Sequence, residues 1–472
     1  MKYLKCTLFV ALVALVSSCE SDYLEPAPTS VISSANYYTT PEQVETAVLN
    51  IYDGIQGVFD FGMDENRALQ LEFYLTEMRS DNTRTKSSEG EAAQFESYAV
   101  EATNGIVANY YQSYYNVIYR ANVALENIDA AGSMAGKLEA EAKFLRAYAY
   151  FNLVRLFGDI PLIDRVISPA DKETAYTRVA TTQIYDLIVS DLTTAVDGLD
   201  NSSSYRASKA AAQTLLAKVH LNKGNYLEAQ QLCEAVVGSG NYSLEANFKD
   251  IFYSEGNDEV IFAVGYIGDS DEAQNFSSEF LNAVGRTSGV NYVTQDAKAA
   301  LDAMGGDRTM YSYRVDSGQV SQNQVAKYIP NGDSALGIEA TSSDPQKAGN
   351  DWVVLRYADV LLLHVEAILA GGSSTTSAAA LSSFNAVRNR AGLANDADSS
   401  ISKQELMDER RVELAFENHR LFDLMRMGAA QEVLSAFATS VGVSFTSSDL
   451  LLPIPQREIN LSNGEMNQNP GY

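Results

Sequence analysis

The stretch "LLAKVHLNKGNYLEAQQLCEAVV", residues 215–237, indicates the fold class most directly. It predicts two helices, about 207–223 and 225–238, with Gly224 making the turn between them. Small and apolar residues recur at the spacing of a tetratricopeptide unit: Ala217, Tyr226, Ala229, Cys233 and Val236. Such repeats bury their apolar faces by stacking helix pairs. We therefore expect a mainly α fold with a tetratricopeptide-like scaffold (an α-α superhelix), in which Cys233 is a small core residue.

Further helical patterns lie on both sides of this pair. Pro41 opens one of them, because proline suits the first turn of a helix. The segment 140–157 is apolar nearly all round and should be largely buried, with Gly158 ending it and Pro161 preventing a restart. The remaining helices are expected at about 110–128, 178–198 and 352–372, and within 380–393 and 403–428.

The composition changes between about residues 241 and 350. "DEVIFAVGYIG", residues 258–268, predicts a strand, and the rest is rich in Gly, Ser, Asn, Asp and Gln. Long irregular segments in a compact protein are usually functional. We expect one domain over 36–472: a helical scaffold at about 36–240 and 351–440, and an irregular, partly β ligand-binding insert at about 241–350.

The amino-terminal segment has the pattern of a secretory signal. A short basic head precedes an apolar run that is too short to span a bilayer, and Ser17 and Ser18 stand before Cys19. We predict a lipoprotein signal peptide over 1–18, lipidation at Cys19, and a tether over 19–35 that contains Pro26 and Pro28. The alternative is an ordinary signal peptide whose cysteine is accidental. No transmembrane helix is expected downstream.

The charge and the cysteine count exclude several classes of protein. The formal net charge of −27 repels phosphates, so nucleic acid is excluded as a partner. The hydrophobic content of 46% supports a sizeable core. Beyond Cys6 and Cys19 only Cys233 remains, so no internal disulfide can form.

The sequence offers little catalytic chemistry. It has three histidines, of which His220 and His364 stand in apolar helices, and it has no metal-binding, phosphate-binding or dinucleotide motif. A carboxylate pair of the glycosidase type cannot be located by counting. One charged cluster suggests helix-stabilising i,i+3 pairs: Arg410, Arg411, Glu413, Glu417, Arg420 and Asp423. We predict no catalytic residue, no metal site and no cofactor.

Four segments together resemble the SusD/RagB family of nutrient-binding outer-membrane lipoproteins. They are "AEAKFLRAYAYFNLVRLFGDIPLI" at 140–163, "VVLRYADVLLLHVEA" at 353–367, "DERRVELAFENHRLFDLMRMG" at 408–428 and "LLPIPQREINLSNGEMNQNPGY" at 451–472. The resemblance implies a lipid-anchored protein on the outer surface of a Bacteroidetes-type bacterium. It would cover a SusC-like TonB-dependent barrel and pass oligomeric nutrients, usually glycans, into it. Members of this family are not enzymes.

Candidate ligand-binding residues lie in two irregular regions. The family's best-known sugar sites use Trp platforms, but this chain has only Trp352, which we interpret as a core or rim residue. Tyrosine would have to supply the aromatic faces, with Asn and Arg binding hydroxyl groups. The loop after "LEFYLTEM" contributes Asn82 and Arg84, with Tyr74 nearby; the insert contributes Tyr292, Tyr311, Tyr313 and Tyr328.

We expect at least one residue from each region to contact an oligosaccharide. Three alternatives stay open at this point. The cargo of a binding lipoprotein could be an oligopeptide, the protein could be a surface glycoside hydrolase, or it could be a purely structural repeat scaffold.

Overall fold

The computed structural model describes residues 37–57, 67–85, 90–168, 170–202, 204–281, 291–315, 323–396 and 398–472. The predicted signal peptide, Cys19 and the tether lie outside the described residues. The described part of the chain has no helix that is both long and apolar enough to cross a membrane.

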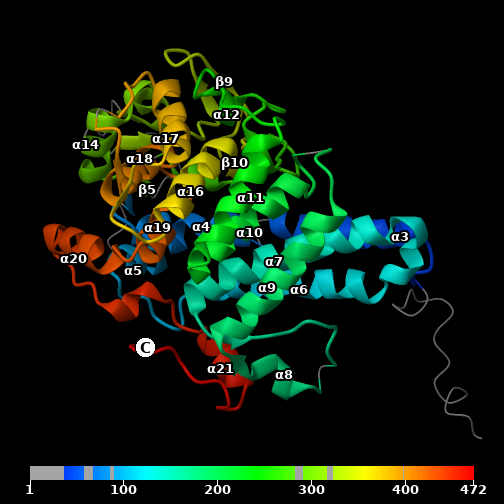
Figure 1. The fold of residues 1–472 in the computed structure, drawn as a ribbon. Coiled ribbons are helices and arrows are strands. Elements are labelled where there is room, and N and C mark those ends of the chain that lie inside the picture. Colours follow the sequence, from blue (N-terminus) through cyan, green and yellow to red (C-terminus); the bar gives the residue numbers. More distant parts are fainter. Residues whose placement is uncertain are drawn as a thin grey trace, which may run out of the picture.

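Helices dominate the fold, and successive helices pack side by side (Figure 1). Before the insert they are α3 (Pro41–Gln56), α4 (Ala68–Leu75), α5 (Glu91–Glu96), α6 (Gly105–Glu126), α7 (Ala135–Phe157), α8 (Lys172–Tyr176), α9 (Thr181–Gly198), α10 (Lys209–Lys223) and α11 (Tyr226–Gly238). After it come α16 (Tyr357–Leu369), α17 (Ala378–Arg390), α18 (Lys403–Glu413), α19 (Arg420–Arg426), α20 (Ala430–Val441) and α21 (Gln456–Leu461). Helix α6 packs on α7, α7 on α9, α9 on α10, α10 on α11, and α11 on α16. This is the predicted mainly α scaffold.

The predicted helix pair is α10 and α11. Gly224 has φ 74° in the left-handed region that glycine favours, and it closes α10 as expected. Ala217 is 0% exposed and Cys233 is 1% exposed, so both are core residues. Pro41 opens α3 and Gly158, with φ 70°, ends α7, both as predicted.

The region between α11 and α16 contains short helices and strands. The helices are α12 (Asp250–Tyr253), α13 (Phe276–Glu279), α14 (Gln295–Met304) and α15 (Thr309–Ser312). The strands are β4 (Val260–Val264), β5 (Asn291–Val293), β6 (Tyr313–Val315), β7 (Asn323–Val325), β8 (Asn331–Asp333) and β9 (Ile338–Ala340). The chain also has short 3-10 helices, labelled η, and two short strand pairs: η2 (Glu77–Arg79), η3 (Ile128–Met134), η4 (Gly306–Arg308), η5 (Ser447–Leu450), β2 (Ile160–Pro161), β3 (Arg178–Val179), β11 (Ser374–Thr375) and β12 (Ile401–Ser402). The predicted strand at 258–268 is β4.

The helix expected to begin at Trp352 begins five residues later. Trp352–Arg356 is a strand, β10, that pairs antiparallel with β4, and α16 starts at Tyr357. A short apolar run does not distinguish a buried strand from a buried helix by periodicity, which explains the error. The pairing ties the insert to the scaffold.

The charged cluster near residues 410–423 forms mostly long-range ion pairs rather than the predicted i,i+3 pairs. The helical pattern breaks between α18 and α19, where Phe416 and Asn418 have positive φ. Arg410 contacts Asp359 and Asp423, each within 2.9 Å. Arg410, Asp359 and Asp423 are buried and paired with one another, so the cluster holds separate segments together.

Candidate ligand-binding site

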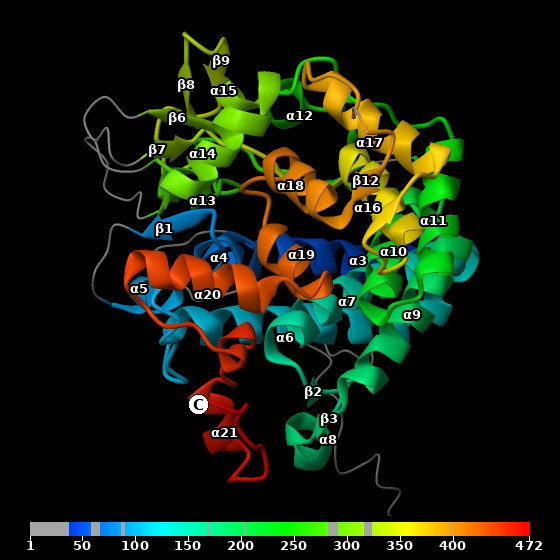
Figure 2. The ribbon, with the colours of Figure 1, turned by 60° about the vertical axis from the view of Figure 1, so that its left-hand side comes forward.

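Three of the predicted ligand-binding residues, Arg84, Tyr292 and Tyr313, lie on a small sheet with the strand order β1-β5-β7-β6. Strand β1 (Thr83–Thr85) comes from the amino-terminal third of the chain and the other three strands from the insert. Figure 2 shows β1, β6 and β7 on its left-hand side. Arg84 on β1 is the direct antiparallel partner of Tyr292 on β5. Direct partners project from the same face of a sheet, so the sheet brings one residue of each predicted region together.

Further residues continue this face across the sheet. Val293 pairs with Asn323 on β7, so the same register sets Tyr292 opposite Gln324, and Gln324 pairs with Arg314 on β6. Arg314 donates from Nε to Gln324 Oε1 at 2.7 Å and from Nη1 to Asp333 Oδ2 at 2.7 Å. One face therefore carries, in order, Arg84, Tyr292, Gln324 and Arg314. We call these four residues the sheet row.

Helix α5 fixes the Arg84 end of the sheet row. The Arg84 guanidinium donates from Nη2 to Glu96 Oε1 at 2.9 Å and from Nε to Glu96 Oε2 at 3.2 Å, while the Thr85 amide donates to Glu96 Oε2 at 2.8 Å. The Arg84 side chain keeps 22% exposure. Burial raises the pKa of Tyr292 and the Arg84 charge opposes the rise, so Tyr292 is protonated at neutral pH. The pair offers a half-buried aromatic side chain beside a positioned guanidinium.

The other predicted tyrosines lie around this sheet but not in the row. Tyr74 is half-buried and packs on Phe95 of α5, with ring centroids 6.1 Å apart. Tyr313 pairs with Val325, which places it on the opposite face, where its hydroxyl donates to Asp302 Oδ1 of α14 at 2.5 Å. Tyr311 packs against the apolar cluster beneath the β8–β9 hairpin. Their contact with a ligand stays a prediction.

Two predicted residues have buried side chains. Asn82 is 1% exposed; its side-chain oxygen accepts from Arg411 Nε at 3.0 Å and its carbonyl oxygen accepts from the Thr294 amide at 2.9 Å. Tyr328, also 1% exposed, stacks on Trp352 with ring centroids 5.2 Å apart. In this structure Asn82 ties the start of β1 to α18 and to the residue after β5. Tyr328 and Trp352, which is 4% exposed, are core residues.

Sequence reasoning missed the partners Glu96, Gln324 and Arg314. Alternation in "YSYRV", residues 311–315, signals a strand, but no local pattern specifies which distant strand pairs with it. Among the described residues no group of three or more His, Cys, Asp or Glu could hold a metal ion. The arrangement can bind polar ligands through guanidinium donors and an aromatic face.

Two family models match this chain in succession. Residues 264–472 match the model described as the SusD family, and residues 22–221 match the one described as "Starch-binding associating with outer membrane". The chain belongs to the SusD family. It is similar to SusD-like protein P2 of Formosa agariphila, with 26% identity over the whole of both chains. It is also similar to the starch-binding protein SusD of Bacteroides thetaiotaomicron, with 23% identity over 71% of this chain and 72% of that protein.

A solved structure agrees with the SusD assignment. The fold matches a laminarin-binding SusD-like protein with a TM-score of 0.77 and 25% identity, covering 92% of this chain and all of the other. The expected fold class is confirmed by this match. All four of the resembling segments quoted above fall within the two regions that the family models match.

Proposed function

We propose that this SusD-family protein captures neutral oligosaccharides at the cell surface and delivers them to a SusC-like TonB-dependent transporter in the outer membrane. The observation that carries the proposal is the sheet row, in which Arg84 and Tyr292 lie side by side and remain partly exposed. Guanidinium groups bind sugar hydroxyls, and aromatic rings pack on the apolar faces of sugars. Similarity to starch-binding and laminarin-binding relatives supports the same ligand class.

The charge distribution favours a neutral cargo over an anionic one. The formal net charge of −27 disfavours anionic ligands. The cation beside Tyr292 in the sheet row, Arg84, is already paired with Glu96. An oligopeptide cargo is the second candidate, because an antiparallel sheet and tyrosine side chains also suit peptide binding. Salt separates the candidates, since a neutral glycan should bind almost equally at low and high ionic strength.

Lipidation at Cys19 would hold the protein on the outer membrane. A single acyl chain gives marginal binding, so the several chains of a lipoprotein cysteine are needed for a stable anchor. We also propose that the protein binds its cargo without catalytic activity, as SusD-type binding proteins do.

Isothermal titration calorimetry against two panels tests the proposal. One panel contains malto-oligosaccharides and laminari-oligosaccharides, and the other contains neutral and charged oligopeptides. We expect binding to at least one glycan series with little change between 50 and 500 mM salt, and no release of reducing sugar on prolonged incubation. Binding to peptides alone would contradict the glycan assignment, and steady product formation would contradict the non-enzymatic one. Affinity purification from membranes with a tagged protein tests the partner, which should be a TonB-dependent barrel.

A further inference from the structure

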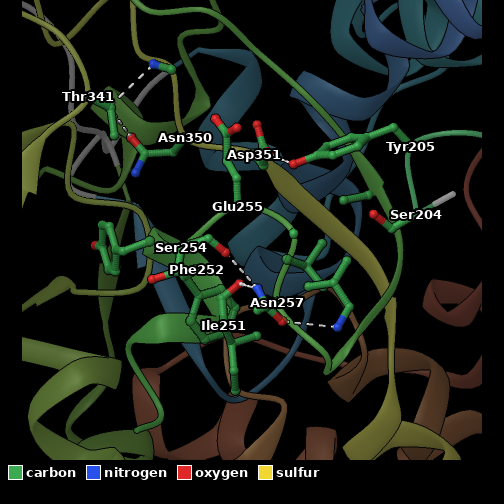
Figure 3. Close-up of a pocket in the computed structure, with 16 residues that line it drawn as sticks. Ser204, Tyr205, Ile251, Phe252, Ser254, Glu255, Asn257, Thr341, Asn350 and Asp351 are labelled. Atoms are coloured by element: carbon green, nitrogen blue, oxygen red, sulfur yellow. Dashed lines mark hydrogen bonds between the residues drawn. The ribbon is translucent and has the colours of Figure 1, made fainter. Parts of the chain in front are cut away.

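A hollow in the surface of the molecule lies away from the sheet row. It has a volume of about 500 Å³, is open to solvent, and is lined by the loop before α10, by α12 and the turn after it, and by the segment that leads into β10 (Figure 3). None of its lining residues belongs to β1, β5, β6 or β7. Tyr205 stands at its edge and also lines a neighbouring hollow between α3 and β4. One tyrosine thus separates two adjoining hollows.

Tyr205 is exposed yet held in place. Its residue is 40% exposed, and its hydroxyl donates to Asp351 Oδ2 at 3.0 Å, as the dashed line in Figure 3 marks. Gly265 lies against one edge of the ring. A Cβ atom placed on this glycine would lie 3.3 Å from Tyr205 Cε1. The other Asp351 oxygen accepts from the Tyr266 amide at 3.0 Å. An exposed aromatic ring that is fixed at its hydroxyl and its edge loses little freedom when a ligand packs on it.

The polar groups around the ring suit hydroxyl groups. Glu255 lies close to both Tyr205 and Asp351, and its carboxylate points toward Asp351 in Figure 3. Burial and these two carboxylates raise the pKa of Tyr205, so its hydroxyl stays a donor. The neighbouring hollow adds Asp53, Gln56 and Glu272. This surface repels anions, because the charged side chains that line it are all acidic.

The hydrogen bonds that Asp351 accepts argue against a cation-binding site here. Both oxygens accept hydrogen bonds from the protein, so Asp351 orients the ring rather than presenting a bare charge. What remains is an aromatic face with acceptors on both sides, which matches the alternating apolar faces and hydroxyl groups of a sugar chain.

We propose that Tyr205 is the platform of a second oligosaccharide-binding site, at which one sugar packs on the ring and its neighbours occupy the two hollows. The site rests on the proposed function for the class of cargo, but it is independent of the sheet row. A protein with two sites holds a long polysaccharide more tightly than a short oligosaccharide, because the second contact is intramolecular.

Retention in gels that contain polysaccharide, together with calorimetry on a short oligosaccharide, tests the proposal. Tyr205→Ala should lower retention by laminarin or starch at least threefold while leaving affinity for the short oligosaccharide at the sheet row within twofold. Tyr205→Phe should keep most of the retention, because it keeps the ring. Tyr119→Ala is the matched control: Tyr119 is 54% exposed on α6 and lines neither hollow, so retention should not change.

Two further variants make the result decisive. In a Tyr292→Ala background, residual retention should disappear when Tyr205→Ala is added. Glu255→Ala changes an exposed side chain, so it leaves the fold intact and should also lower retention. Equal retention of wild type, Tyr205→Ala and Glu255→Ala would overturn the second site alone. A wild-type protein that no glycan retains would overturn the proposed function and this site with it. Retention of lysine-rich peptides that salt abolishes would identify the surface as a cation site and overturn the proposal.

Discussion

Arg84 and Tyr292 are direct antiparallel partners on β1 and β5, although Arg84 lies between α4 and α5 of the scaffold and Tyr292 lies in the insert. Glu96 holds Arg84 through two hydrogen bonds, so the guanidinium is positioned before any ligand arrives. Pre-organisation of this kind reduces the entropy lost on binding. The pair therefore defines the first surface at which to look for ligand contacts.

Alanine substitution in the sheet row should weaken ligand binding without unfolding the protein. Arg84→Ala and Tyr292→Ala should each lower glycan affinity about tenfold, equivalent to about 1.4 kcal/mol, because each removes a partly exposed contact group. Calorimetry measures the affinity, and a thermal melt should shift little. Tyr119→Ala is the control at an exposed tyrosine outside the row.

Tyr313→Ala separates the two faces of the same sheet. Tyr313 lies on the face opposite Tyr292, where it bonds to Asp302 of α14. A ligand that contacts both faces of the sheet should lose affinity in the Tyr313→Ala variant, whereas a ligand confined to the sheet row should not. Unchanged affinity in Arg84→Ala, Tyr292→Ala and Tyr313→Ala together would contradict the site.

Overpacking the helix pair should destabilise the scaffold. Ala217 is fully buried on α10, which packs against α9 and α11, so Ala217→Leu should lower the free energy of unfolding by about 1–3 kcal/mol. Urea denaturation measures the change. Ala235→Leu adds the same side chain at an exposed position of α11 and should have little effect. Equal stability of the two variants would mean that Ala217 has more space than its burial indicates.

Breaking the buried ion-pair network should cost far more than breaking an exposed pair. Arg356 contacts Glu259, Glu413 and Glu417 within 2.8 Å, and its side chain is 1% exposed. Arg356→Met leaves three buried carboxylates without this partner, so the free energy of unfolding should fall by about 3–5 kcal/mol. Arg165→Met, at an arginine whose side chain is 54% exposed, should change it by less than about 1 kcal/mol. A small effect at Arg356 would show that the carboxylates are neutralised in another way.

Glu72 should make stability depend on pH. Burial raises its pKa from 4.5 to about 7, although the Arg155 and Lys218 charges oppose the rise, and Oε2 has no hydrogen-bond partner among the described residues. Because the folded state binds this proton more tightly than the unfolded state, the stabilisation is fully present below pH 4.5 and is lost as the pH rises to about 7.

Glu72→Gln should remove that dependence. Relative to wild type, the free energy of unfolding of the variant should rise by about 3 kcal/mol between pH 4.5 and pH 8. Urea denaturation at both pH values measures the difference, and Glu465→Gln at an exposed position is the control. A difference that does not vary with pH would show that Glu72 titrates normally.

Cys19→Ser tests the anchor. If Cys19 carries the lipid as proposed, the serine hydroxyl cannot replace its thiol, so the variant should be released from membranes or stall as a precursor. Fractionation after a high-salt wash, in cells that lack the proposed barrel partner, provides the measurement. A variant that still sediments with the outer membrane would contradict lipidation at Cys19. Protease shaving of intact cells should digest the wild-type protein if it faces the exterior.

The sequence by itself determined the helical scaffold, because its information is local. The 3.6-residue periodicity, Pro41 at the start of α3 and Gly224 between α10 and α11 each act within a few residues, and the structure has these features where they were predicted. Burial of Ala217 and Cys233 followed from the same repeat spacing.

Only the tertiary structure decided the candidate ligand surfaces and the strand at Trp352. Strand pairing joins residues that are far apart in the chain, so no local pattern specifies that Arg84 lies opposite Tyr292 or that Tyr205 bonds to Asp351. Burial is equally non-local. Tyr328 and Tyr292 both stand in the irregular insert, and nothing in the sequence near them distinguishes the two. In the structure the Tyr328 ring stacks on Trp352 in the core, while Tyr292 stays partly exposed. A one-residue change of register would reverse which side chains share a face, and that register depends on the packing of the whole chain.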